Sequence, residues 1–199
     1  MPDDKRGREK QARDADRRQR VRAIATELER MAETEPPVAA DALEDLETEL
    51  DDIDFPATGA EVVAAVGDET FASDEGLVGV AELLPETAAE TFAAPADVLA
   101  RVQRPTIAGA MKRVIEANAA VSNDHLDDSR RKAYEKTFRA LKAIDADDED
   151  EGVRVVTDWI VEQTRENEQP PGSRSVRREG ARFCRTHGYE IRDDDWLGV

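Results

Sequence analysis

The chain has 199 residues, with 46 acidic and 28 basic side chains and a formal net charge of −18. It contains no run of the roughly 18 to 20 apolar residues that a membrane span requires and no apolar stretch near Met1, so we expect a cytoplasmic protein without membrane contact. The single cysteine, Cys184, excludes an internal disulfide and agrees with a reducing compartment.

The charge is unevenly distributed along the chain. Residues 1–22 carry nine basic and five acidic side chains, residues 173–199 carry six and five, and the segment between them has a net charge of −23. Such a density of carboxylates is typical of proteins that stay soluble in molar salt, where the Debye length is about 3 Å and self-repulsion is screened. We therefore expect a halophilic source, with an ordinary acidic cytosolic protein as the alternative.

The N-terminal part is expected to contain a basic tail and a helical hairpin. Residues 1–20 have hardly any large apolar side chains, so we expect a disordered or frayed basic segment. Two stripes of apolar residues follow, each with spacings of three, four and three residues, and Pro36-Pro37 lies between them. The two stripes predict a helical hairpin over 21–54. Separate docking of each stripe and a dimeric coiled coil are the alternatives. The stripes are Val21, Ile24, Leu28 and Met31, and then Leu43, Leu46, Leu50 and Ile53.

The segment 55–104 is predicted to be a small helix-hairpin-helix-helix unit. Its first helix begins after Thr58, because Glu61 three residues later completes a capping box. It ends at Gly67, which can adopt the left-handed conformation. Two short β-compatible runs then predict one small hairpin over 69–78.

Two further short helices complete this unit. Residues 80–84 form an apolar helical turn that Pro85 closes. The next helix begins at Pro95, a residue suited to the first helical position, and Asp97 lies near the positive end of its dipole.

Six short motifs follow one another here: Phe55-Pro56-Ala57-Thr58, Glu61-Val62-Val63, Gly67-Asp68, Glu82-Leu83-Leu84, Glu90-Thr91-Phe92 and Pro95-Ala96-Asp97-Val98. In this order they resemble a small family of uncharacterised domains common in halophilic archaea. The resemblance covers about 50–102. Its motifs are mostly helix caps and core positions, so it implies a fold and no activity.

A longer helical region is predicted over 105–165, with apolar stripes that we interpret as core. One helix opens at Pro105-Thr106, and Ser122-Asn123-Asp124 separates it from the next. The acidic run 145–151 does not fit a calcium loop, because Asp150 stands where glycine is required and Val156 where glutamate is required. We interpret the run as a solvated charged segment.

The C-terminal part is predicted to hold the partner-binding residues. Residues 166–174 are a linker, and 175–199 form a basic helix, which a glycine ends, followed by an apolar tail. Arginine and aromatic side chains dominate interface energies, so this end is the candidate contact surface. The alternative is that the tail folds back and caps its own core. The candidates are Arg177, Arg178, Arg182, Phe183, Arg185, Tyr189, Trp196 and Leu197.

No catalytic, cofactor or metal site is expected. Cys184 and His187 with His125 cannot supply four zinc ligands from one chain. We interpret Cys184 as a small buried apolar residue and His187 as a cation at a helix end. Ser129 lies near His125 and Asp128, but nothing in the sequence brings them together in a pocket, and no glycine-rich phosphate loop occurs.

The sequence therefore predicts a mainly α protein, a bundle of short amphipathic helices with one small β-hairpin. We expect a non-enzymatic interaction or adaptor protein, in which an acidic helical scaffold presents arginine-rich ends to a partner protein or to another copy of the chain. The alternative is a nucleic-acid-binding or ribosome-associated regulatory protein that binds through its basic ends, with the hairpin as a possible wing.

Overall fold

The computed structural model describes residues 35–199, except 75, 123–124, 145–149, 192–195 and 199. Residues 37–199 form one compact unit. The predicted basic segment at 1–20 and the first stripe of the predicted hairpin over 21–54 lie outside the described residues. The second stripe is described, and its residues Leu43, Leu46 and Leu50 are buried.

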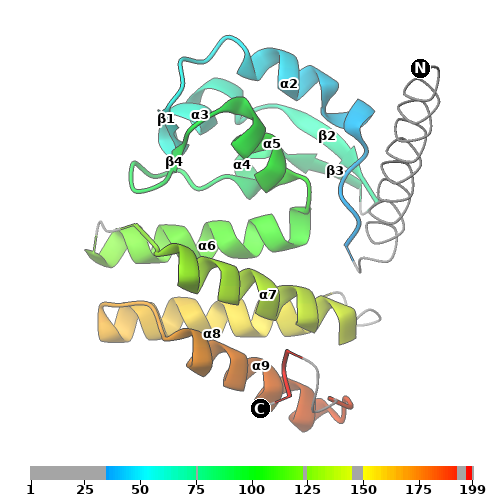
Figure 1. Cartoon of the computed structure of the whole chain (residues 1–199), viewed down its shortest axis with the longest axis vertical. Coiled ribbons are helices and arrows are strands. Elements are labelled where there is room, and N and C mark those ends of the chain that lie inside the picture. Colours follow the sequence, from blue (N-terminus) through cyan, green and yellow to red (C-terminus); the bar gives the residue numbers. More distant parts are fainter. Residues whose placement is uncertain (1–34, 75, 123–124, 145–149, 192–195, 199) are drawn as a thin grey trace, which may run out of the picture. The chain divides into compact units, whose positions relative to one another are not determined.

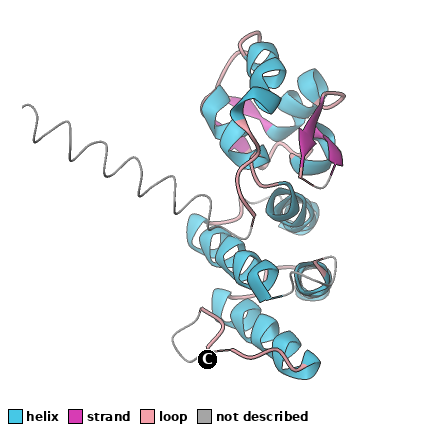
Figure 2. Cartoon of the chain, turned by 90° about the vertical axis from the view of Figure 1, so that its right-hand side faces the viewer, coloured by secondary structure: helices cyan, strands magenta, loops and turns pink. Residues whose placement is uncertain are grey.

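The described chain is mainly helical, as predicted (Figure 1). Strands occur only in the first part of the compact unit, and long helices follow them (Figure 2). The helical elements are η1 (Ala40–Leu43), α2 (Glu44–Leu50), α3 (Gly59–Val66), α4 (Val80–Leu83), α5 (Pro95–Val102), α6 (Pro105–Ser122), α7 (Asp128–Ile144), α8 (Glu151–Asn167) and α9 (Ser173–His187). The strands are β1 (Ala57–Thr58), β2 (Thr70–Ser73), β3 (Gly76–Gly79) and β4 (Thr91–Phe92).

Among the described residues two small antiparallel sheets are present, the predicted hairpin and a second sheet that was not predicted. The hairpin is present as β2 and β3, with Phe71 opposite Val78. A second sheet pairs β1 with β4 in the register Ala57 opposite Phe92. Each of its strands has two residues, and more than thirty residues separate them in sequence, so no local pattern marks the pair.

The start of α3 shows why this sheet forms where it does. The predicted capping box is present: the Glu61 amide donates to the Thr58 hydroxyl over 3.3 Å, and the Glu61 carboxylate accepts from the Thr58 amide over 2.8 Å. The Gly59 amide donates to the Glu90 carbonyl over 2.9 Å. A Cβ at Gly59 would lie 2.1 Å from the Pro85 carbonyl oxygen, so this close approach requires glycine.

Gly67 ends α3 differently from the prediction. Its φ is −64°, so its backbone is right-handed and not left-handed. The Gly67 amide continues the helical pattern by donating to the Val63 carbonyl over 2.8 Å. A Cβ at this position would lie 2.4 Å from the same oxygen. Glycine is therefore needed here for space and not for a positive φ.

Helix α6 connects two hydrophobic clusters. Its residue Ala108 belongs to the cluster built by η1, α2–α5 and the small sheets, and its Met111 belongs to the cluster of α6–α9 and the C-terminal tail. In Figure 1, α6 lies between α4 and α5 on one side and α8 on the other. The predicted stripes of α6, α7 and α8 supply the second cluster, as expected of core positions.

The ends of the last helices are fixed by specific contacts. The Tyr134 hydroxyl on α7 donates to the carbonyl of Pro171, which holds the connection between α8 and α9 against α7. Gly188 ends α9 with a φ of +77°, as the predicted glycine stop requires. Asp150 differs from the expected solvated run, because its carboxylate accepts from Lys142 over 2.8 Å and is only 22% exposed. Residues 145–149 lie outside the described part.

Candidate functional site

The two apolar residues at the centre of the predicted partner site are internal. Leu197 is 1% exposed and Phe183 is 4% exposed, and both belong to the cluster of α6–α9. The Phe183 ring lies 4.2 Å from the His187 ring and 6.2 Å from that of Tyr189, measured between centroids. These side chains therefore stabilise the end of α9, and the tail packs on the core of its own chain.

Trp196 attaches the tail to α7 and α9. Its indole Nε1 donates to the Thr137 hydroxyl on α7 over 3.0 Å. The Lys136 ammonium lies 4.2 Å from the centroid of the indole, and the Arg177 guanidinium carbon lies 5.0 Å from it. Arg177 also donates to the Gly198 carbonyl over 2.6 Å. Arg177 and Trp196, both predicted to contact a partner, thus contact each other.

Three predicted residues remain exposed on α9: Arg178, Arg182 and Arg185. They are spaced by four and three residues and so share one face of the helix. Arg182 forms a hydrogen-bonded ion pair with Glu179 on the same helix. The hydrogen bonds and the charge of Glu179 raise the pKa of the Arg182 guanidinium. The Arg185 Nε donates to the Ala181 carbonyl over 3.0 Å.

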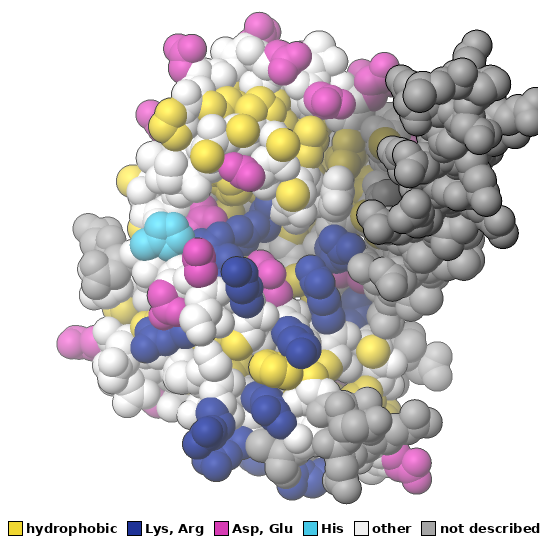
Figure 3. All heavy atoms as spheres, viewed as in Figure 1, with side chains coloured by type: hydrophobic (Ala, Val, Ile, Leu, Met, Phe, Trp, Pro, Cys, Tyr) yellow, Lys and Arg dark blue, Asp and Glu magenta, His cyan; other side chains and the backbone are white. Residues whose placement is uncertain are grey.

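A matching set of cations lies on α7, which packs against α9. Lys132, Lys136 and Arg139 are exposed, with the same spacing of four and three residues. Figure 3 shows Lys and Arg side chains gathered over α7 and α9 on the face in view, whereas Asp and Glu predominate over α2. We call Lys132, Lys136, Arg139, Arg178, Arg182 and Arg185 the α7–α9 basic face.

This face contrasts with the first half of the compact unit. Residues 35–100 contain 18 acidic side chains and no lysine or arginine. By comparison, α7 carries six basic and two acidic residues, and α9 carries five and one. Any carboxylate that is buried in the segment 35–100 must therefore obtain its counter-charge from outside that segment.

A cavity of about 360 Å³ lies where these two parts meet, between the segment of β4, the helices α5 and α6, and α7. Four arginines and three carboxylates line it, together with apolar side chains. The charged residues are Arg101, Arg104, Arg131, Arg139, Glu90, Asp97 and Glu135, and the apolar ones are Phe92, Ala100, Ile107, Ala108 and Met111.

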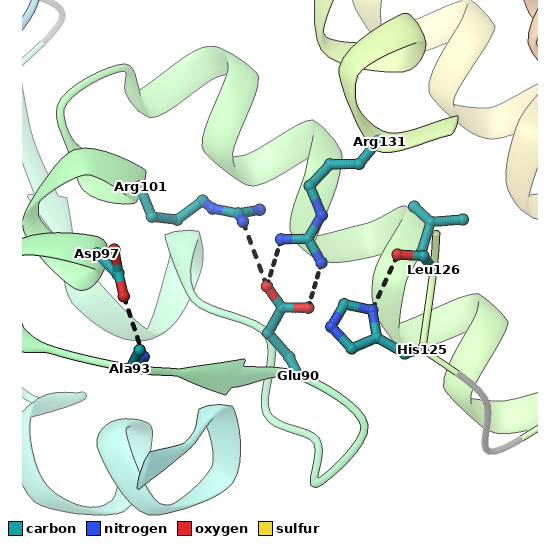
Figure 4. A network of polar contacts seen from close by, with 7 residues as sticks. All are labelled: Glu90, Ala93, Asp97, Arg101, His125, Leu126 and Arg131. Atoms are coloured by element: carbon teal, nitrogen blue, oxygen red, sulfur yellow. Dashed lines mark hydrogen bonds and ion pairs between the residues drawn. The ribbon is translucent and has the colours of Figure 1, made fainter. Parts of the chain in front are cut away.

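Glu90 is the central charged group of this cavity, as Figure 4 shows. Its side chain is 2% exposed and forms a bidentate pair with Arg131 on α7, with N···O distances of 2.5 and 2.6 Å. Arg101 on α5 donates to the same carboxylate over 3.2 Å. Asp97 faces away from the arginines and accepts from the Ala93 amide over 3.0 Å.

Burial affects the two arginines in different ways. For Arg101, burial and the nearby positive charge of Arg131 lower the pKa. For Arg131, burial is the largest single influence and acts to lower the pKa, but the hydrogen bonds to Glu90 and the negative charges of Glu90, Glu135 and Asp128 together raise it. Arg101 Nη1 and Arg131 Nε are buried and have no hydrogen-bond partner among the described residues. The two guanidiniums therefore have donors that Glu90 does not use.

The histidines and the cysteine of the described part have structural contacts. The His125 Nδ1 lies 2.8 Å from the Leu126 carbonyl oxygen, and the His187 Nδ1 lies 2.9 Å from that of Phe183. Cys184 is fully buried, as predicted. Among the described residues, no group of three potential metal ligands occurs. None of the described helices is long and apolar enough to span a membrane.

Sequence reasoning identified the exposed arginines of α9 but missed the cavity. Its arginines come from α5, α7 and the connection before α6, and no linear motif joins them. One signal was available: a segment of 66 residues without a single lysine or arginine precedes Arg101. Within that segment Glu90 lies between Ala88-Ala89 and Thr91-Phe92-Ala93-Ala94, a mostly apolar stretch in which a buried carboxylate needs a cation.

Comparison with known proteins supports the first half of the compact unit as a recognisable domain. No curated protein matches the chain, and no solved structure does. A match to a protein family covers a segment that includes the whole of the stretch 50–102. This segment supplies Glu90, Arg101 and Arg104 to the cavity, whereas Arg131 and Arg139 lie beyond it. Residues 41–114 match the family of unknown function DUF5789, so the chain contains a domain of that description.

Proposed function

We propose that the protein is a non-enzymatic interaction protein whose α7–α9 basic face binds an acidic partner protein. One observation carries this proposal: on a chain with a net charge of −18, six cations occupy one face of each of two adjacent helices. Their concentration creates a local positive potential that steers an acidic partner toward this face.

The contact surface differs from the one expected from sequence alone. Phe183 and Leu197 stabilise the core, and the Trp196 ring contacts both Lys136 and Arg177. The exposed arginines of α9 remain, and Lys132, Lys136 and Arg139 join them. Arginine is suited to this role because its planar guanidinium binds carboxylates with two parallel hydrogen bonds.

A nucleic-acid-binding or ribosome-associated role is the second candidate, because the same six cations could contact phosphates. Two observations favour a protein partner. The aromatic rings that would stack on bases are engaged inside the chain. The hairpin of β2 and β3 cannot serve as a basic wing, since residues 35–100 contain no lysine or arginine.

Charge reversal on α9 tests the proposal. We expect the double variant Arg178→Glu/Arg185→Glu to lose the proteins that the full chain captures from native lysate. Arg154→Glu/Arg165→Glu on α8 is the matched control, because both residues are exposed and the net charge changes equally. An unchanged set of captured proteins in the α9 variant contradicts the proposal.

The same variants separate the two candidates. Binding to mixed RNA and duplex DNA is measured over a salt titration, in which phosphate contacts produce a steep loss of affinity with increasing salt. A steep slope that only the α9 variant abolishes supports the nucleic-acid role. Sedimentation of the purified chain shows whether a second copy, through its acidic residues 35–100, is the partner instead.

We also propose that the protein works in the cytoplasm of a halophile. The support is the distribution of carboxylates: 18 of them lie within residues 35–100, a segment that contains no lysine or arginine. Such a segment repels itself at low ionic strength and is tolerated when salt screens the repulsion.

A further inference from the structure

We propose that the cavity between α5, α6 and α7 binds a small ligand that carries one oxyanion, a carboxylate or a phosphate, on an apolar body. This inference concerns a small molecule and does not depend on the macromolecular partner proposed above.

The charges of the cavity leave room for an anion. Four arginines line it, against three carboxylates. One of these, Asp97, uses its oxygen to accept from the backbone amides of Ala93 and Ala94. Glu90 alone bonds both Arg101 and Arg131, which are each 14% exposed. Glu135, the third carboxylate, acts on both arginines through its charge. The four arginines and three carboxylates of the lining together leave one net positive charge.

The hydrogen bonds point to an additional acceptor. Arg101 Nη1 and Arg131 Nε are buried without a partner, and both belong to guanidiniums that line this cavity. Buried donors are nearly always paired in folded proteins, with protein, water or ligand. An oxyanion offers several lone pairs and can accept from two guanidiniums at once, which is the arrangement that arginine recognises best.

The remaining lining determines the class of ligand. A volume of about 360 Å³ falls within the range of small-molecule sites, which combine apolar walls with few polar groups. Phe92, Ile107 and Ala108 supply an apolar wall beside the arginines. Bound water could satisfy the two donors, but it gains nothing from that wall, whereas an aryl or alkyl group on the anion does.

Arg139 completes the site at its solvent side. It lines the cavity, is exposed, and forms no ion pair with any other described residue. It can therefore bind an entering anion without giving up an existing bond. Its replacement leaves the Glu90 network intact, which makes Arg139 the best residue for a binding test.

The experiment uses the full chain at constant potassium chloride concentration and measures binding of inorganic phosphate, phenyl phosphate and benzoate by calorimetry. We expect phenyl phosphate to bind about tenfold more tightly than inorganic phosphate, because the ring covers the apolar wall. Comparison of phenyl phosphate with benzoate identifies the preferred oxyanion. Absence of saturable binding for all three compounds overturns the proposal.

Three variants locate the binding. Arg139→Gln is expected to weaken phenyl phosphate about tenfold, by loss of one charge-assisted contact. Arg178→Gln, on α9 and outside the cavity, should leave the affinity unchanged. Glu90→Gln should tighten binding, because it removes the carboxylate that competes for both arginines. If Glu90→Gln does not fold, Arg139→Gln and Arg178→Gln decide the test. Equal phenyl phosphate affinities for these two variants contradict the proposed site.

Discussion

Among single residues, Glu90 has the most unusual environment in the described chain. It comes from a segment that contains no basic residue, yet its carboxylate is almost fully buried between Arg101 and Arg131. Removal of one member of a buried charge network leaves the others without compensation in a medium of low dielectric constant. The Glu90 carboxylate therefore connects the residues before β4 with α5 and α7.

We predict that Glu90→Ala lowers the free energy of unfolding by about 3–5 kcal/mol, since two largely buried guanidiniums lose their shared partner. Chemical denaturation in urea measures the change. Arg113→Ala is the control, because the ion pair of Arg113 with Asp158 is about as short, at 2.5 Å, but lies at the surface. Its loss should cost at most about 1 kcal/mol. Equal losses for the two variants would contradict the assigned role of Glu90.

The capping box of α3 gives a second prediction for single residues. Hydrogen bonds from the backbone amide and the hydroxyl of Thr58 lower the pKa of Glu61 below its ordinary value of 4.5. A lowered pKa in the folded state means that this contribution to stability is complete above pH 4.5. It is lost as the pH falls through the lower pKa of the folded protein.

Thr58→Ala should therefore reduce the free energy of unfolding by about 1 kcal/mol at neutral pH and return the Glu61 pKa toward its ordinary value. A carboxyl-detected NMR titration measures the pKa, and urea denaturation measures the stability. Thr48→Ala, in α2, is the control, because the Thr48 hydroxyl donates only to the Glu44 carbonyl within the helix. A Glu61 pKa that is unchanged in Thr58→Ala would exclude the Thr58 hydroxyl as a cause of the lowered pKa, because the backbone amide at this position still donates to Glu61 in the variant.

At the scale of elements, the C-terminal tail behaves as a part of the core that contacts α7 and α9. Leu197 packs against Gly180 of α9, where an added Cβ would lie 3.1 Å from the Leu197 Cδ2 and 3.2 Å from the Thr137 Cγ2. The absence of a side chain at Gly180 thus creates the space that Leu197 fills. A mutation on either side of this contact should weaken the attachment of the tail.

Leu197→Ala is expected to lower the free energy of unfolding by about 2–5 kcal/mol, the usual cost of a large cavity in a core. Leu77→Ala is the matched control: Leu77 is 80% exposed, so the change should stay within about 0.5 kcal/mol. If Leu197→Ala proves as mild as Leu77→Ala, the tail is not part of the core.

The elements also show what the sequence could predict. Helices α6, α7 and α8 follow from long apolar stripes, and α3 and α5 from their caps, because each of these signals lies within a few residues. The sheet of β1 and β4 was missed, since its pairing depends on the Gly59 amide meeting the Glu90 carbonyl. The cavity was missed for a similar reason: Arg101 and Arg131 meet only through tertiary packing on Glu90.

For the whole molecule, the main feature is the separation of charge between two parts of one compact unit. Residues 35–100 contribute carboxylates alone, whereas α7 and α9 contribute most of the exposed cations of the described residues. Within the acidic part, repulsion between neighbouring carboxylates opposes folding and depends on ionic strength. The buried network of Glu90 is screened much less, so it holds the acidic part to α7 even when salt is high.

This distribution predicts that salt stabilises the protein. When the ionic strength rises from about 0.1 M to about 1 M, the Debye length falls from about 10 Å to about 3 Å, and repulsion within residues 35–100 is suppressed. The free energy of unfolding, measured by urea titration in increasing potassium chloride, should therefore increase.

The neutral variant Glu44→Gln/Asp45→Asn/Glu47→Gln/Glu49→Gln, altered at four exposed positions of α2, should be more stable than the natural chain at low salt. It should also gain less on addition of salt, because fewer charges remain to be screened. Parallel salt curves for the two proteins would show that carboxylate repulsion is not the cause, and that the salt acts on burial of apolar surface instead.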